Sequence, residues 1–125
     1  MDLTNSILED VRAGVALSRD TADFDTELLM HINVAISILN QNGIGNLLTV
    51  TDTSTTWADL QDVTQIKGNE YFQIVPLFVT MSTKVIFDPP PPSAVEYHSK
   101  SIDQMLWRLK LAYEQPIIVV TEVVE

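Results

Sequence analysis

Apolar positions along the chain recur at helical spacing in four segments, and this pattern predicts four helices. The first is expected over residues 3–16, with Gly14 weakening its end. The third is expected to start near Val75 and to run to Ile86, so that Pro76 is at or next to the first position, where its missing N–H costs little. In the first segment apolar residues recur every three or four residues, which is typical of a helix with one buried face. The β-branched residues of the third segment leave a strand as the alternative there.

The second and fourth predicted helices differ, because each carries apolar side chains on two faces. The second is expected to be capped by Asp23 or Asp25 and to stop at Asn42 and Gly43, and the fourth is expected to run from Ser93 to Pro116. Opposite the core stripe lie Met30, Val34 and Ile38 on the second helix and Trp107 and Leu111 on the fourth. A small monomer normally keeps one helix side polar, so these five side chains are predicted interface residues. The alternative is that neighbours within one domain cover both helices.

Between the second and third helices, residues 44–69 are rich in Thr, Asp and Asn and have little apolar pattern. Residues 47–50 could form a short strand, and residues 57–63 a helical turn capped by Thr55 or Thr56. A connection of this length in a compact domain is usually functional or partly disordered. The pattern therefore predicts a long polar middle loop.

A run of four prolines separates the third and fourth helices, within the sequence VIFDPPPPSA at residues 85–94. Proline fixes φ and lacks an N–H, so the run cannot continue a helix. Asp88 is expected to end the third helix, and Ser93 with Glu96 has the spacing of a capping box for the fourth. We predict a structural corner made of Phe87, Asp88, Pro89, Pro90, Pro91, Pro92, Ser93 and Glu96.

The C-terminal residues are almost wholly β-branched, which is typical of a strand, although no pairing partner lies nearby in sequence. Such a strand can fold back as an edge strand or add to a partner's sheet. The predicted partner contacts are Ile117, Ile118, Val119, Val120, Val123 and Val124. The predicted fold is mainly α: a small three- to four-helix bundle over residues 1–115, with a long polar middle loop and an extended, β-prone arm over residues 116–125.

Composition narrows the possible functions. The chain of 125 residues fits one domain, and its formal charge of −10 argues against a surface that grips nucleic acid or an anionic membrane. The absence of cysteine excludes disulfides and thiolate metal sites. The longest apolar stretch is too short to span a bilayer. Residues 1–20 do not resemble a signal peptide, because they carry charges at Asp2, Glu9, Asp10 and Arg12.

Candidate chemistry is sparse. His31 and His98 lie on different predicted helices without a ligand partner at zinc-site spacing. The acidic residues between Asp20 and Glu27 lack the calcium-loop pattern and are better explained by helix capping. The residues therefore offer no credible enzyme and no metal site of the usual spacing.

Five short stretches, taken in order, resemble one protein family. They are DTADFDTELLMHIN at residues 20–33, LNQNGIG at 39–45, TWAD at 56–59, VIFDPP at 85–90 and MLWRL at 105–109. This order resembles the head–tail connector (adaptor) proteins of long-tailed double-stranded DNA bacteriophages, over about residues 3–113. The FDPP stretch followed by WRL is the most distinctive part.

The resemblance implies a mainly helical, non-enzymatic subunit without a cofactor, which forms a ring, expected to be a dodecamer, beneath the portal protein. Such a ring lies at the head–tail junction of the virion and continues the channel for double-stranded DNA without sequence-specific binding. It also offers a docking surface to stopper or tail-terminator proteins, and its subunits are expected in the host cytoplasm during assembly. Two alternatives remain at this point. One is a soluble binding or chaperone-like module whose C-terminal strand captures a partner, and the other is a metal-dependent enzyme built on His31 and His98.

Overall fold

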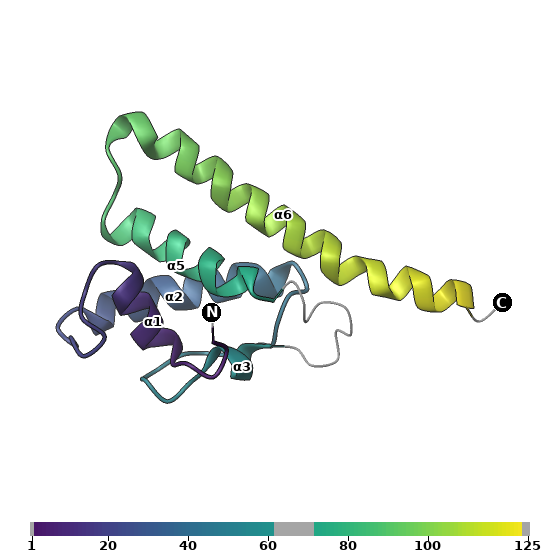
Figure 1. Cartoon of the computed structure of the whole chain (residues 1–125), viewed down its shortest axis with the longest axis horizontal. Helices are drawn as coiled ribbons and strands as arrows, with labels where there is room; N and C mark the ends of the chain where they lie inside the picture. Colours follow the sequence, from purple (N-terminus) through teal and green to yellow (C-terminus); the bar gives the residue numbers. More distant parts are fainter. Residues whose placement is uncertain (1, 62–71, 124–125) are drawn as a thin grey trace.

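The computed structural model describes the backbone of residues 2–61 and 72–123 and the side chains of residues 2–61 and 72–112. These ranges contain five helices and no strand (Figure 1). The fold is therefore mainly α, as predicted. The helices are α1 (Ile7–Gly14), α2 (Asp25–Gln41), α3 (Trp57–Leu60), α5 (Ile74–Phe87) and α6 (Pro92–Val123).

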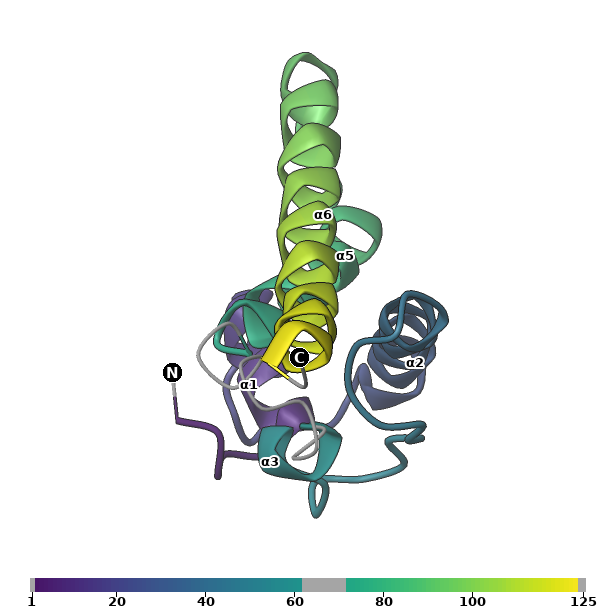
Figure 2. The ribbon, with the colours of Figure 1, turned by 90° about the vertical axis from the view of Figure 1, so that its right-hand side faces the viewer.

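Helix α5 is the centre of the bundle, because α1, α2 and α6 all contact it. The view in Figure 2 shows α1 on one side of α6 and α2 on the other. One hydrophobic core joins these helices with α3, and its largest fully buried side chains include Trp57, Phe72 and Phe78. Removing these apolar side chains from water is the main favourable term in forming the bundle.

Helix α1 begins later than predicted, at Ile7, because the preceding residues pair with the segment that leads into α3. The Ile7 N–H donates to the Thr55 carbonyl at 2.9 Å, and the Ala58 N–H donates to the Leu3 carbonyl at 2.8 Å. Ser6 caps α1 by accepting a hydrogen bond from the Glu9 N–H at 3.3 Å. The predicted end near Gly14 is confirmed.

The predicted capping of α2 by Asp23 or Asp25 was wrong. Phe24 occupies the N-cap position without a side-chain hydrogen bond, and Asp25 is already the first helical residue. The Asp25 carboxylate binds Arg12 instead, so a tertiary ion pair takes the place of the local cap. At the other end the prediction is confirmed, because Gly43 follows the helix with φ +79°, the left-handed conformation that glycine adopts without strain.

The middle loop has no strand at residues 47–50, so that prediction was wrong. Side-chain amides satisfy the backbone where a strand partner would have done so. Asn33 on α2 donates to the Val50 carbonyl at 3.0 Å and accepts from the Val50 N–H at 2.8 Å. Asn40 donates to the carbonyls of Ile44 and Asn46 at 3.0 and 2.8 Å.

The predicted helical turn in this loop is present as α3. Thr56 caps it and forms a capping box with Asp59, so one of the two predicted caps is confirmed. The turn ends at Leu60 rather than at residue 63. Residues 62–71 lie outside the described residues.

Helix α5 begins at Ile74, which places Pro76 third in the helix rather than first; this is still within the first turn, where backbone N–H groups lack intrahelical acceptors. Asp88 is its C-cap, as predicted. Helix α6 begins at Pro92, so the predicted capping box of Ser93 and Glu96 was wrong. Proline is favoured at the first helical position because its fixed φ suits the helix. Glu96 faces Lys100 one turn later, at 3.4 Å.

The bounds of α6 take in most of the predicted arm, residues 116–125. Side chains from residue 113 onward lie outside the described residues, and the expected contacts from Ile117 to Val124 fall among them. The helix continues past Pro116, where it was predicted to end, so the backbone of residues 116–123 is not extended. The partner of the arm and the division into residues 1–115 and 116–125 remain predictions.

Candidate interaction surfaces

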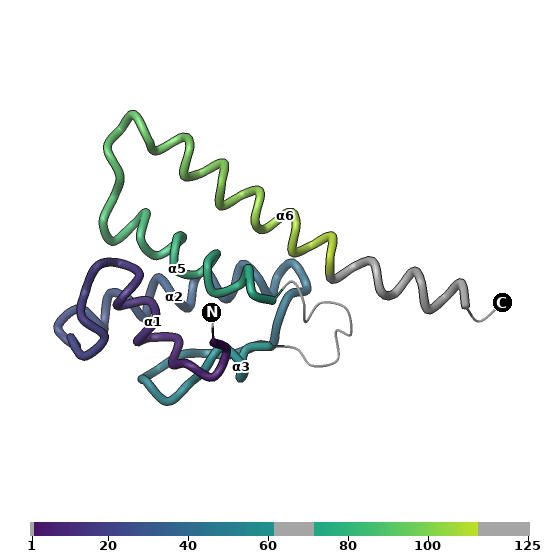
Figure 3. Tube along the Cα trace, viewed as in Figure 1, coloured from purple at the N-terminus to yellow at the C-terminus, as the bar shows by residue number. Residues whose placement is uncertain are grey.

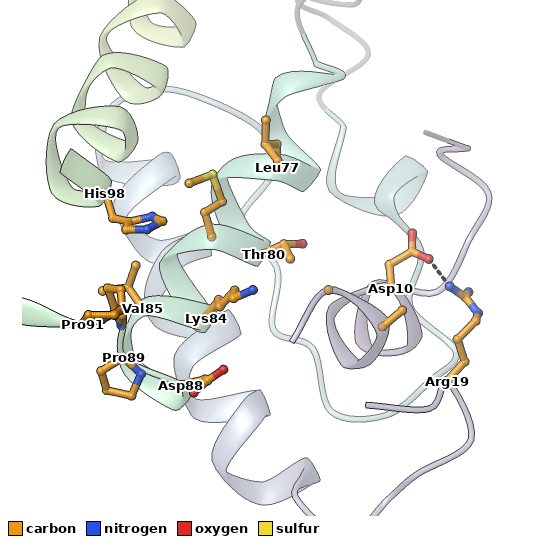
Figure 4. A pocket seen from close by; sticks show the side chains of 14 residues that line it. Asp10, Arg19, Leu77, Thr80, Lys84, Val85, Asp88, Pro89, Pro91 and His98 are labelled. Carbon is orange, nitrogen blue, oxygen red and sulfur yellow. Dashed lines mark hydrogen bonds and ion pairs between the residues drawn. The ribbon is translucent and has the colours of Figure 1, made fainter. Parts of the chain in front are cut away.

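A buried polar network fixes α1 against α3 and the loop that leads to α2. The Asp10 carboxylate accepts a hydrogen bond from the Trp57 indole N–H at 2.7 Å and another from Arg19 at 2.6 Å (Figure 4). Asn5 contributes a longer bond to the same carboxylate, at 3.4 Å. Because Asp10 is almost fully buried, these donors replace the water that its charge would otherwise require.

A second ion pair ties α1 to α2. The guanidinium of Arg12 donates from Nε and Nη2 to the two Asp25 oxygens at 3.1 and 2.6 Å. Its Nη1 donates to the Arg19 carbonyl at 2.6 Å. The hydrogen bond to Asp25 raises the pKa of Arg12 above its ordinary value, so the guanidinium stays charged. The charged side chains of the two ion pairs are thus bound to one another and to nearby backbone and indole groups, which assigns them a structural role.

Helices α1 and α5 cross at very close range at one point. A Cβ atom on Gly14 would overlap the Cγ2 atom of Thr80, so only glycine permits this approach. The sequence pattern indicated Gly14 only as a helix end, and no local signal could have shown its partner on α5.

The predicted second faces of α2 and α6 are exposed to solvent in the single chain. On α2 the side chains of Met30, Val34 and Ile38 are 62%, 55% and 36% exposed, and we call this set the α2 ridge. On α6 the side chains of Trp107 and Leu111 are 62% and 40% exposed, and we call this pair the α6 ridge. The alternative in which neighbours within the domain cover both faces was therefore wrong.

The opposite sides of the same helices are buried. Helix α2 buries Ile32 and Ile36, and α6 buries Leu109 and Ala112. Spacings of three and four residues keep each set on one side, so core and ridge are separate faces of each helix. The ridges are surface that remains after the domain's own core is complete.

The predicted corner does turn the chain, and it also lines a groove. Pro89, Pro90 and Pro91 form one wall of a groove of about 840 Å³, which α1 and α5 complete (Figure 4). In the trace of Figure 3, α5 and α6 lie apart at the corner and approach each other further along α6. Phe87 anchors the end of α5 by an edge-to-face contact with Phe24, with ring centroids 5.5 Å apart.

The groove gathers charged side chains that the sequence pattern did not bring together. Lys84 and Asp88 come from α5 and its cap, Arg19 from the loop after α1, and His98 from α6. Arg19 is already paired with Asp10, and among the described side chains Lys84 forms no ion pair. No local pattern predicts this grouping, because its members are up to 79 positions apart, from Arg19 to His98.

Neither histidine has the neighbours of a metal ligand. His31 lies 3.6 Å from Glu27, one turn earlier on α2, and His98 packs edge-to-face against Tyr97. Across the residues with described placement, no group of three or more His, Cys, Asp or Glu side chains could hold a metal ion. Nor does any helix within that part of the chain have the length and apolar character needed to cross a membrane.

These features define a small helical domain with uncovered apolar surface, which is typical of a subunit that packs against other chains. The family model described as "Phage connector protein" matches residues 7–116, and the chain belongs to this family. The family is one of structural proteins of phage particles, so the chain has the role of a structural connector. No curated protein and no solved structure matches the chain.

Proposed function

We propose that copies of this chain form a ring at the junction between the head and the tail of the phage. The ring docks on the portal protein, continues the DNA channel and offers a surface to stopper or tail-terminator proteins. The membership of the connector family supports this proposal, as does the exposed apolar surface of α2 and α6. The subunit works by position and contact, without catalysis or a cofactor.

The observation that carries the proposal is the exposure of both ridges. Trp107 is 62% exposed, so most of the free energy that burial of its large apolar side chain would supply is not gained in the single chain. Leu111 lies beside it, one turn later. Contiguous apolar patches on a small domain mark contacts with other chains. A subunit in a closed ring has two neighbours, so it can cover one such patch against each of them.

The charge of the chain suits passage of DNA. Proteins that hold DNA neutralise its phosphates with Lys and Arg, whereas this chain has a formal charge of −10. Acidic side chains along a channel repel the phosphates, so DNA slides without being trapped. Sequence-specific binding is not part of the proposed role.

The C-terminal arm is proposed to contact the portal or a neighbouring subunit through its β-branched side chains. A chain lacking residues 116–125 should keep the helical domain, with an unchanged unfolding midpoint, and bind the portal more weakly. Circular dichroism and a portal pull-down measure the two effects. Loss of the folded domain would instead make the arm part of the core.

The main test is the double variant Trp107→Ala with Leu111→Ala. We expect unchanged helical content, because both side chains are exposed, and loss of ring assembly or of incorporation into particles. Leu47→Ala is the matched control, since Leu47 is 94% exposed and lies outside both ridges. Normal incorporation of the double variant would refute the role of this surface.

A further inference from the structure

The α2 ridge and the α6 ridge are two uncovered apolar faces on one chain, and they lie on different helices. Both helices pack on α5, and Figure 2 shows α2 displaced to one side of α6. A chain with two different faces can join copies head to tail, each face meeting the other face of the next copy. A contact between two identical faces would cover one ridge and leave the other exposed.

The charges around the ridges distinguish between these arrangements. Residues 2–61 hold nine acidic and two basic side chains, a formal charge of −7. Helix α2 has no Lys or Arg, and of its two acidic residues Asp25 is paired with Arg12. Glu27 lies one turn before Met30 on the exposed side. Two α2 ridges in contact would therefore bring acidic surfaces together.

The α6 ridge has the opposite character. Arg108 and Lys110 flank Trp107 and Leu111, both are exposed, and within the described residues neither forms an ion pair. Residues 92–112 have a formal charge of +1, in a chain whose net charge is −10. Asp103 is also exposed and lies one turn before Trp107, so the border of the α6 ridge holds two basic side chains and one acidic side chain. Its net positive charge complements an apolar ridge with an acidic border.

We propose that the α6 ridge of one copy packs on the α2 ridge of the next copy, with Arg108 and Lys110 close to Glu27. This contact deepens the proposed ring, on which it rests, by naming the two faces that meet. The apolar side chains supply the burial, and the charges exclude the pairing of two α2 faces.

Cysteine cross-linking tests the pairing directly, because the natural chain has no cysteine. We expect Val34→Cys and Leu111→Cys chains to form a disulfide-linked dimer when they are mixed under oxidising conditions at up to millimolar concentration. Neither variant should cross-link to itself. A chain with both substitutions should give a ladder of multimers on a non-reducing gel.

The control for proximity is Ser99→Cys, an exposed position on α6 outside the ridge. Mixed with Val34→Cys, it should give no more dimer than either variant alone. Self-cross-linking of Val34→Cys or Leu111→Cys would show contacts between identical faces and overturn the proposal. Absence of the mixed dimer over the whole concentration range would overturn it as well.

Charge reversal provides a second readout. Arg108→Glu should weaken association in sedimentation by about tenfold, and Glu27→Arg on the partner copy should restore part of it. Equal association of all combinations would remove the charge argument and the proposal with it.

The same cysteine variants separate this inference from the proposed function. If the protein is absent from purified particles, the proposed function fails. If it is present and its copies are cross-linked through identical faces, only the pairing of the ridges fails. Mass spectrometry of purified particles detects whether the protein is present and identifies which cysteine-containing peptides are cross-linked.

Discussion

The two tryptophans of this chain lie in opposite environments. Trp57 on α3 is fully buried and donates to the Asp10 carboxylate, whereas Trp107 on α6 is 62% exposed. The region around Trp57 combines close packing with a satisfied polar network, and α6 beyond the corner has mostly exposed side chains until Leu109. The comparison separates residues that make the domain from residues available to a partner.

The difference has an energetic consequence. Substitutions near Trp57 act on the free energy of unfolding, because they open a cavity or strand a buried charge. Substitutions on the α6 ridge act on the exposed surface and leave the folded chain's own contacts intact. The following predictions test that division, beginning with the largest effect.

Trp57→Ala should lower the free energy of unfolding by about 3–5 kcal/mol, since it removes a buried ring and one hydrogen-bond donor to Asp10. Trp107→Ala should change it by less than about 0.5 kcal/mol. Urea unfolding followed by circular dichroism measures both. Equal losses for the two variants would erase the distinction between the regions.

Gly14→Ala should lower the free energy of unfolding by about 1–3 kcal/mol, because the new Cβ overlaps Thr80 at the α1–α5 crossing. Combining it with Thr80→Ser removes the Cγ2 atom and should recover most of the loss. Thermal unfolding of the two single variants and the double variant gives the coupling. If the second substitution recovers nothing, the crossing is not the cause.

Asn33→Ala should lower the free energy of unfolding by about 1–2 kcal/mol, since it removes the two hydrogen bonds that hold Val50 to α2. The Val50 N–H loses its hydrogen-bond acceptor, so the loss of protection at Val50 exceeds what the lower global stability alone would cause. Hydrogen exchange at Val50 should accelerate, while exchange in the middle of α5 follows global stability alone. Unchanged protection at Val50 would contradict this assignment.

Tyr97→Ala, in the exposed first part of α6, should have the smallest effect, within about 0.5 kcal/mol. Leu109→Ala on the same helix is the matched comparison, and its full burial predicts a loss of about 2–5 kcal/mol. Chemical unfolding of both variants locates where α6 begins to contribute to the core. A large loss for Tyr97→Ala would move that point toward the corner.

Much of the fold was predictable because its signals are local. The apolar spacing predicted α1, α2 and α6 as helices, Gly43 marked the end of α2, and Asp88 marked the end of α5. The presence of a second apolar face on α2 and on α6 was also predictable, since it follows from the spacing of the side chains on one helix.

The errors arose where a distant residue replaced a local partner. Asp25 was predicted as a cap but binds Arg12. Residues 47–50 were predicted as a strand, but Val50 forms its backbone hydrogen bonds with the side-chain amide of Asn33. Ser93 was predicted to cap α6, although Pro92 already begins that helix. In the first two cases a tertiary contact outweighed a local preference of about 1 kcal/mol.

The sequence by itself determined the helices, the break at the proline run and the two apolar faces of α2 and α6, because periodicity and proline geometry act within a few residues. The tertiary structure decided which of those faces the domain leaves uncovered, which charge meets which, and that Gly14 is needed for the approach to Thr80. Those outcomes depend on how α5 brings α1, α2 and α6 together, and the distances between side chains on different helices are set only when the core closes.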